Sequence, residues 1–82
     1  MNNKQVERML AIVTDTSDYQ AKYMLSMLAF IIQDALRRGD NVQIDNIGTF
    51  HVMDSNNMND KKRVNLKAHA ALKAAINEEL NE

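Results

Sequence analysis

The sequence predicts an α+β fold in which two N-terminal helices precede a three-stranded antiparallel sheet and a C-terminal helix. Three observations predict it. Apolar residues recur every three or four positions early in the chain, then alternate with polar residues, and then return to helical spacing. Because 82 residues suffice for one domain, we expect 1–82 to be a single domain. Its expected parts are a helical dimerisation part at 1–38, a sheet at 41–67 with a short hairpin at 53–63, and a C-terminal helix at 68–82.

The first helix has a clear start. The side chain of Asn2 or Asn3 can accept hydrogen bonds from the free amides of a first turn. The apolar residues that follow lie on one helical face: Val6, Met9, Leu10 and Val13. This helix is expected to stop near 14–16.

The second helix is apolar on more than one side. Ser17 and Gln20 have the spacing of a capping box, and Gly39 suits a left-handed C-terminal cap after about 21 helical residues. Arg37 and Arg38 suit the negative end of the helix, so we expect them to cap it rather than form a site. A surface helix normally keeps its second face polar, whereas "MLSMLAFII" is apolar nearly all round. We therefore expect this helix to be buried on two sides, one of them against a second copy.

Alternating apolar residues predict three strands, around 42–44, 49–52 and 63–66. Asp45–Asn46 is a turn pair, and Gly48 is expected to occupy a bulge or bend. The candidate dimer core draws on the second helix and the first two strands: Met24, Leu25, Leu28, Phe30, Ile31, Ile32, Ile44, Phe50 and Val52.

Composition excludes several function classes. Cysteine is absent, and His51 and His69 are too few to suggest a metal site. No apolar run approaches the length of a membrane span, and no catalytic motif or phosphate loop is present. We expect a non-enzymatic cytoplasmic protein without a metal, cofactor, small-molecule substrate or membrane partner.

Two stretches carry a resemblance to a known family. "ALRRGDNVQIDNIGTFHV" at 35–52 and "VNLKAHAALKAAIN" at 64–77 resemble the signature and closing segments of the HU/integration host factor family of bacterial DNA-bending proteins. The resemblance implies an intertwined dimer whose second helices and sheets share one core. It also implies a ribbon that leaves the body after "TFHV". In the family that ribbon is a long basic arm whose proline wedges between base pairs and kinks the duplex.

This chain departs from the family pattern at the arm. Only eleven residues lie between Val52 and Val64, and they include Asp54 and Asp60 but no proline. In the last segment His69 stands where the family usually has glycine. We therefore expect the fold without the wedge, and hence little bending of DNA.

The best local cluster of positive charge surrounds the third strand. Its members are the candidate DNA-binding residues: Lys61, Lys62, Arg63, Lys67 and Lys73. Such side chains displace counterions from phosphates. The structural alternative is a solvated rim, where lysines discourage the pairing of sheet edges. The acidic residues of the same hairpin put negative charge near this cluster and therefore count against DNA binding.

Two functional hypotheses follow. The first is a histone-like protein of the bacterial nucleoid or of a phage-infected cell, a homodimer that binds duplex DNA weakly and without strong sequence preference through a basic saddle. The second is a DNA-independent dimeric assembly protein, which would include a heterodimer that inhibits a full-length HU-like homologue. The net charge of −1 and the apolar Met53 and Met58 of the hairpin favour the second.

Overall fold

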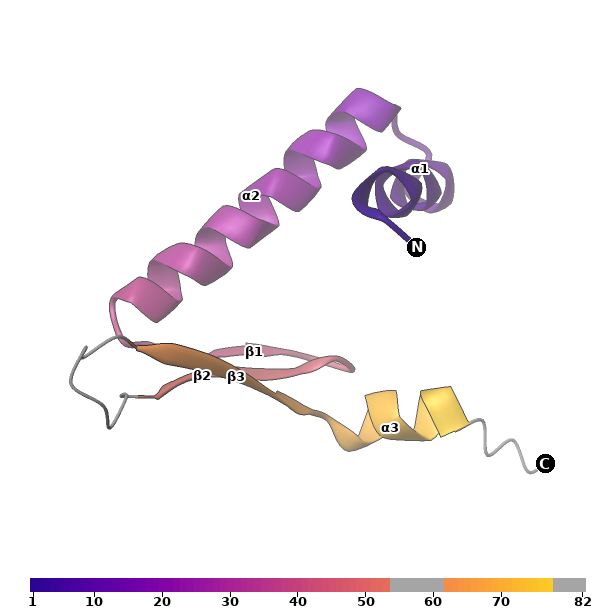
Figure 1. Ribbon diagram of the computed structural model, residues 1–82. Helices are drawn as coiled ribbons and strands as arrows, with labels where there is room; N and C mark the ends of the chain where they lie inside the picture. Colours follow the sequence, from indigo (N-terminus) through magenta and orange to yellow (C-terminus); the bar gives the residue numbers. More distant parts are fainter. Residues whose placement is uncertain (54–61, 78–82) are drawn as a thin grey trace. The chain divides into compact units, whose positions relative to one another are not determined.

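The computed structural model describes residues 1–53 and 62–77, and the chain forms two compact units, 1–33 and 34–82. The elements follow the order α1, α2, β1, β2, β3, α3 (Figure 1). This is the predicted α+β architecture. Most of the expected hairpin, including Lys61, lies outside the described residues, and so do the last residues of the chain.

Helix α1 (Asn3–Thr14) begins with a complete capping box at Asn2. The amide of Gln5 donates to the side-chain oxygen of Asn2 over 3.0 Å, and the amide of Asn2 donates to Gln5 Oε1 over 2.8 Å. These two bonds satisfy donors that a helix start otherwise leaves free. The helix ends at Asp15, whose backbone is left-handed with φ 58°. The predicted first helix is confirmed.

Helix α2 (Asp18–Arg37) has the predicted capping box at its start and the predicted left-handed glycine after its end. The Gln20 amide donates to Ser17 Oγ over 3.0 Å, and the Ser17 amide donates to Gln20 Oε1 over 3.1 Å. At the other end Gly39 has φ 89°, and the Asp40 amide donates to the carbonyl of Ala35 over 2.9 Å. The left-handed glycine thus closes the last turn of the helix.

The sheet is antiparallel, with strand order β1 (Val42–Ile44), β2 (Gly48–Met53) and β3 (Arg63–Ala68). Phe50 of β2 pairs with Val42 on one side and with Leu66 on the other. Since paired residues point to the same side of a sheet, this register sets the chemistry of both faces.

The expectation of a bulge or bend at Gly48 is wrong. Gly48 pairs regularly with Ile44 and with Ala68, and its backbone is not left-handed. The reason for glycine is a close approach: a Cβ there would lie 2.6 Å from the backbone oxygen of Lys67. The unusual backbone angle in this region belongs instead to the turn residue Asn46, with φ 69°.

Helix α3 (Ala70–Asn77) begins two residues later than predicted. Ala68 is the last residue of β3, because its pairing with Gly48 keeps the backbone extended. His69 joins the two elements: its amide donates to the Ile47 carbonyl, and its own carbonyl accepts from Lys73. The start of α3 is therefore tied to the connection between β1 and β2.

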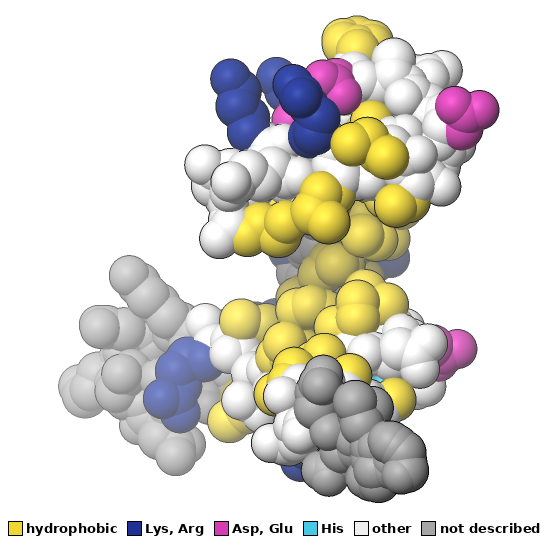
Figure 2. Space-filling view, turned by 90° about the vertical axis from the view of Figure 1, so that its right-hand side faces the viewer, with side chains coloured by type: hydrophobic (Ala, Val, Ile, Leu, Met, Phe, Trp, Pro, Cys, Tyr) yellow, Lys and Arg dark blue, Asp and Glu magenta, His cyan; other side chains and the backbone are white. Residues whose placement is uncertain are grey.

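The described part of the chain buries few hydrophobic side chains. Only Ala11 (3% exposed) and Ala21 (0% exposed) are buried. Figure 2 shows hydrophobic side chains open to solvent in both units. The candidate dimer-core residues are all incompletely covered in the single chain: Leu25, Ile32, Ile44, Phe50 and Val52 are half-buried, and Met24, Leu28, Phe30 and Ile31 are exposed.

Two further findings apply to residues 1–53 and 62–77. No helix there is long and apolar enough to cross a membrane. The same residues bring together no group of three histidine or carboxylate side chains that could hold a metal ion.

Candidate nucleic-acid interface

One face of the sheet is polar and carries two of the candidate DNA-binding residues. Side chains alternate between the two sides along each strand, and the register of β1, β2 and β3 determines which of them share this side. We call it the polar face, and its members are Gln43, Thr49, His51, Met53, Arg63, Asn65 and Lys67.

The opposite face of the sheet is apolar throughout. Its members, the apolar face, are Val42, Ile44, Phe50, Val52, Val64, Leu66 and Ala68, together with Gly48. Leu66 remains 46% exposed and Val64 59% exposed. Since apolar surface of this extent is normally covered, we expect this face to pack and the polar face to meet solvent or a ligand.

Arg63 and Lys67 lie on the polar face, both exposed. They are four residues apart on β3, so their Cα atoms lie about 13 Å apart along the strand. This separation exceeds what one phosphate group could bridge. The two side chains would therefore reach different phosphates of a nucleic-acid backbone.

The basic segment from Lys62 to Asn77 contains no acidic residue. It holds Lys62, Arg63, Lys67 and Lys73, all exposed. Within the described part of the chain, no ion pair neutralises any of these four side chains. Uncompensated positive charge of this kind is what phosphate binding requires.

A contact between β2 and the start of α3 was not foreseen from the sequence. Thr49 Oγ1 and His69 Nε2 are hydrogen-bonded at 3.2 Å, part-buried. Thr49 is paired with Lys67 in the sheet. The bond thus fixes the origin of α3, which carries Lys73, next to the polar face. The sequence separation of twenty residues gave no local signal for this contact.

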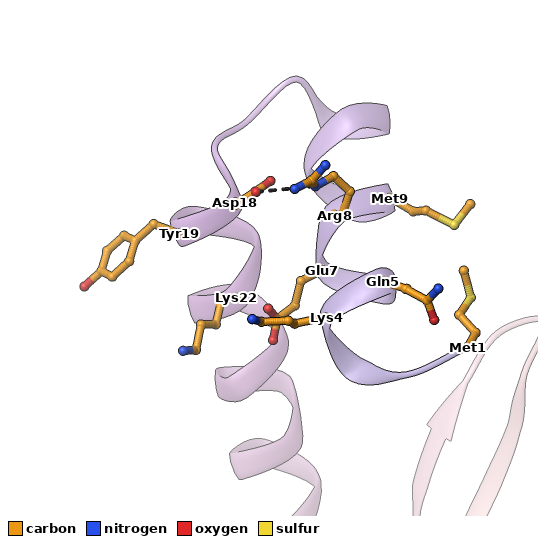
Figure 3. Close-up of a pocket in the computed structure, with 9 residues that line it drawn as sticks. All are labelled: Met1, Lys4, Gln5, Glu7, Arg8, Met9, Asp18, Tyr19 and Lys22. Atoms are coloured by element: carbon orange, nitrogen blue, oxygen red, sulfur yellow. Dashed lines mark ion pairs between the residues drawn. The ribbon is translucent and has the colours of Figure 1, made fainter.

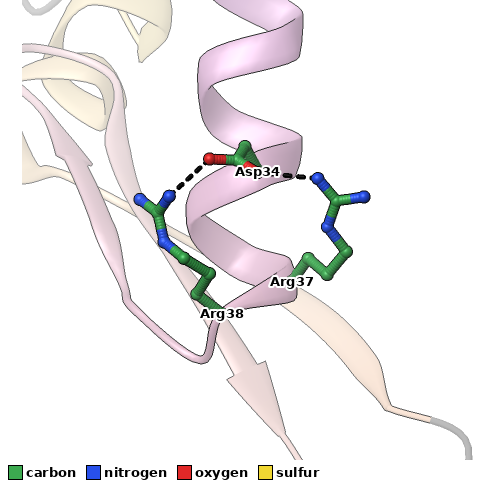
Figure 4. Close-up of polar contacts among 3 residues, drawn as sticks. All are labelled: Asp34, Arg37 and Arg38. Atoms are coloured by element: carbon green, nitrogen blue, oxygen red, sulfur yellow. Dashed lines mark hydrogen bonds and ion pairs between the residues drawn. The ribbon is translucent and has the colours of Figure 1, made fainter.

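Arg37 and Arg38 are engaged by one carboxylate at the end of α2. Arg37 Nη2 lies 2.6 Å from Asp34 Oδ1, and Arg38 Nη1 lies 2.5 Å from Asp34 Oδ2 (Figure 4). The hydrogen bond from Arg37 is the largest influence that lowers the pKa of Asp34 below its usual value. Both guanidinium groups are thus paired with a carboxylate at the C-terminal end of α2.

Charges in the helical unit are mixed in sign. An open hollow between α1 and the start of α2 is lined by Lys4, Glu7, Arg8, Asp18 and Lys22, among others (Figure 3). Arg8 Nε lies 3.5 Å from Asp18 Oδ2. Lysine and arginine are balanced by aspartate and glutamate over residues 1–33, three of each. The hollow is therefore lined by charges of both signs.

Comparison with solved structures shows the same fold in HU proteins. A point mutant of HU from Thermotoga maritima matches with a TM-score of 0.80 and 26% identity, over 93% of this chain and 99% of that one. HU from Thermotoga maritima matches with a TM-score of 0.77 and 26% identity, over 93% and 98%. A cocrystal structure of Anabaena HU with DNA matches in fold, with a TM-score of 0.79 and 18% identity over 95% and 99%.

The comparison with curated proteins found no match. The family model described as "Bacterial DNA-binding protein" matches residues 1–80, which is nearly the whole chain. With two N-terminal helices, a three-stranded sheet, a C-terminal helix and a basic strand at its edge, the chain belongs to this family of bacterial DNA-binding proteins.

Proposed function

We propose that this protein is a non-enzymatic, histone-like dimer that binds duplex DNA weakly and with little sequence preference through the polar face of its sheet. Its place would be the bacterial nucleoid or a phage-infected cell. The observation that carries the proposal is the basic segment 62–77, which has four lysine and arginine residues, no acidic residue and no internal ion pair.

Dimerisation is supported by what the single chain leaves uncovered. The apolar face and one side of α2 expose large side chains such as Ile31 (59%) and Leu66 (46%). Covering them removes apolar area from water, at roughly 25 cal/mol for each Å². Two copies would also double the number of phosphates within reach. The alternative role of these lysines, to discourage pairing at the edge of the sheet, gives no reason for a second copy.

Weak binding follows from the charge of the whole chain. Its net charge is −1, so long-range attraction toward DNA is absent and affinity depends on local contacts. The short connection between β2 and β3 contains no proline to wedge between base pairs. We therefore propose little bending. Contacts to phosphates do not read the bases, so binding through them should show little sequence preference.

The test is a fluorescence-anisotropy titration of a labelled duplex of about 30 base pairs at several salt concentrations between about 50 and 200 mM. If about six phosphates are contacted, log K falls with log salt at a slope near −5. A second, unrelated duplex is expected to bind equally well. Absence of binding at low salt would rule out this function.

A second candidate function rests on the exposed apolar surface. Met53, at the end of β2, is 41% exposed on the otherwise polar face. The protein would then be a DNA-independent assembly module, or would pair with a full-length homologue and inhibit it. Tagged protein treated with nuclease and recovered from a bacterial lysate discriminates the two. An HU-like partner in equal amount supports the second candidate, and a pure homodimer that binds duplex supports the first.

A further inference from the structure

We propose that His51 and His69 bind DNA phosphates in their protonated form, so that the affinity for duplex DNA rises as the pH falls from about 8 to about 6. This inference rests on the proposed function and adds to it a regulation by pH. It is carried by the position of His51 on the polar face and by the hydrogen bond of the His69 ring to Thr49, a residue of that face.

His51 lies within the basic part of the sheet. It pairs directly with Asn65 of β3, so Arg63 and Lys67 are its two diagonal neighbours on the same face. Diagonal neighbours in a sheet lie about 7–8 Å apart, which is within reach of long side chains. The pairing of β1 with β2 ends at Val42 and Phe50, so no β1 partner covers His51.

His69 lies at the other side of Lys67. Its ring reaches Thr49 Oγ1 at 3.2 Å, and Thr49 is the residue paired with Lys67. The charged residues on the segments bonded to His69 are Lys73, whose amide donates to the His69 carbonyl, and Asp45, two residues before Ile47, whose carbonyl accepts from the His69 amide. Within the described residues no ion pair joins Asp45 to His69.

The hydrogen bond of His69 is compatible with either charge state. A threonine hydroxyl both donates and accepts, so it can serve a neutral ring nitrogen or a protonated one. The ring is therefore held in one place while its charge changes. Histidine is the side chain whose charge changes between about pH 5 and about pH 8.

Protonation would enlarge the positive surface where it already exists. Each copy would add two positive charges to the polar face, next to Arg63 and Lys67. Each added phosphate contact steepens the dependence of log K on log salt by about 0.9 and, at about 50 mM salt, strengthens binding on the order of tenfold. DNA binding would accordingly be linked to uptake of protons.

The experiment measures duplex binding by the full chain at about pH 6 and about pH 8, at equal ionic strength. Wild-type protein is expected to bind more tightly at the lower pH, on the order of tenfold for each histidine that contacts a phosphate, with a steeper salt slope. In the double variant His51→Gln, His69→Gln the ratio between the two pH values should fall to about one. Lys22→Gln, on the helical unit, should keep the wild-type ratio.

A second measurement does not depend on the variants. Calorimetry in two buffers of different ionisation enthalpy counts the protons taken up when wild-type protein binds the duplex. Uptake near neutral pH supports the inference, and no uptake overturns it. A pH ratio that persists in the double variant also overturns it. Equal binding at both pH values removes this inference alone, whereas no binding at either removes the proposed function.

Discussion

The two faces of the sheet share one backbone and one register, yet they differ in chemistry: one is apolar, and the other is polar except for Met53. Phe50 and Leu66 face each other on the apolar face, and the next pair along, His51 and Asn65, lies on the polar face. The first face needs to be covered, and the second carries the positive charge. The difference separates two roles: substitutions on the apolar face should act on folding and assembly, and those on the polar face on DNA.

The largest expected effect is that of Phe50→Ala, which should destabilise the protein by about 3–4 kcal/mol through the cavity it leaves. Phe50 is only half-buried in the single chain, so the full effect requires that a second copy covers it. Asn65→Ala, on the polar face, is the control and should change stability by less than about 0.5 kcal/mol. Urea unfolding at fixed protein concentration measures both. Equal effects would erase the distinction between the faces.

Gly48→Ala is expected to come next, with a cost of about 1–3 kcal/mol, because the new methyl group must displace a backbone oxygen 2.6 Å away. Gly39 is the matched control, since a Cβ there meets nothing within 4 Å and only its φ of 89° is unfavourable for other residues. Asparagine tolerates such angles better than alanine. Thermal unfolding of the two variants Gly39→Asn and Gly48→Asn should therefore show a small loss of Tm for the first and a large loss for the second.

Lys67→Gln should leave stability nearly unchanged and weaken duplex binding on the order of tenfold at about 50 mM salt for one lost phosphate contact. Lys22→Gln removes the same charge from the helical unit and should bind like the wild type. Anisotropy titrations compare the two variants. Equal losses would mean that net charge rather than the polar face determines affinity.

The smallest expected effect concerns Asp34. Its pKa is lowered in the folded protein by the hydrogen bond from Arg37, so its contribution to stability is present above the unfolded value of about 3.9 and is lost as the pH falls through the lower folded value. Asp34→Asn should therefore lower Tm slightly at neutral pH, and the difference from the wild type should vanish in strong acid. A difference that grows in acid would contradict this assignment.

Local signals in the sequence predicted the helices well. Asn2, one of the two predicted caps, starts α1, and Ser17 and Gln20 form the predicted capping box of α2. The part that Gln5 plays in the first capping box was not predicted. Gly39 likewise ends α2 as expected, because its requirement is a backbone angle that few other residues adopt.

Features that depend on distant residues were not predictable in the same way. The need for glycine at 48 arises from the backbone of β3, about twenty residues away, so its sequence pattern fitted a bend equally well. The same holds for the bond between Thr49 and His69. The basic set was visible in the sequence, but only the register of β2 against β3 shows which of its members share a face with the histidines.

That Ala11 and Ala21 are the only hydrophobic side chains buried in the described part of a single copy has a consequence for the cell. If the proposed dimer covers this surface, a single copy would be less stable than the dimer and more often open to proteases. Its lifetime would then rise with its own abundance, so that a low rate of synthesis yields almost none and a modest increase yields a stable pool.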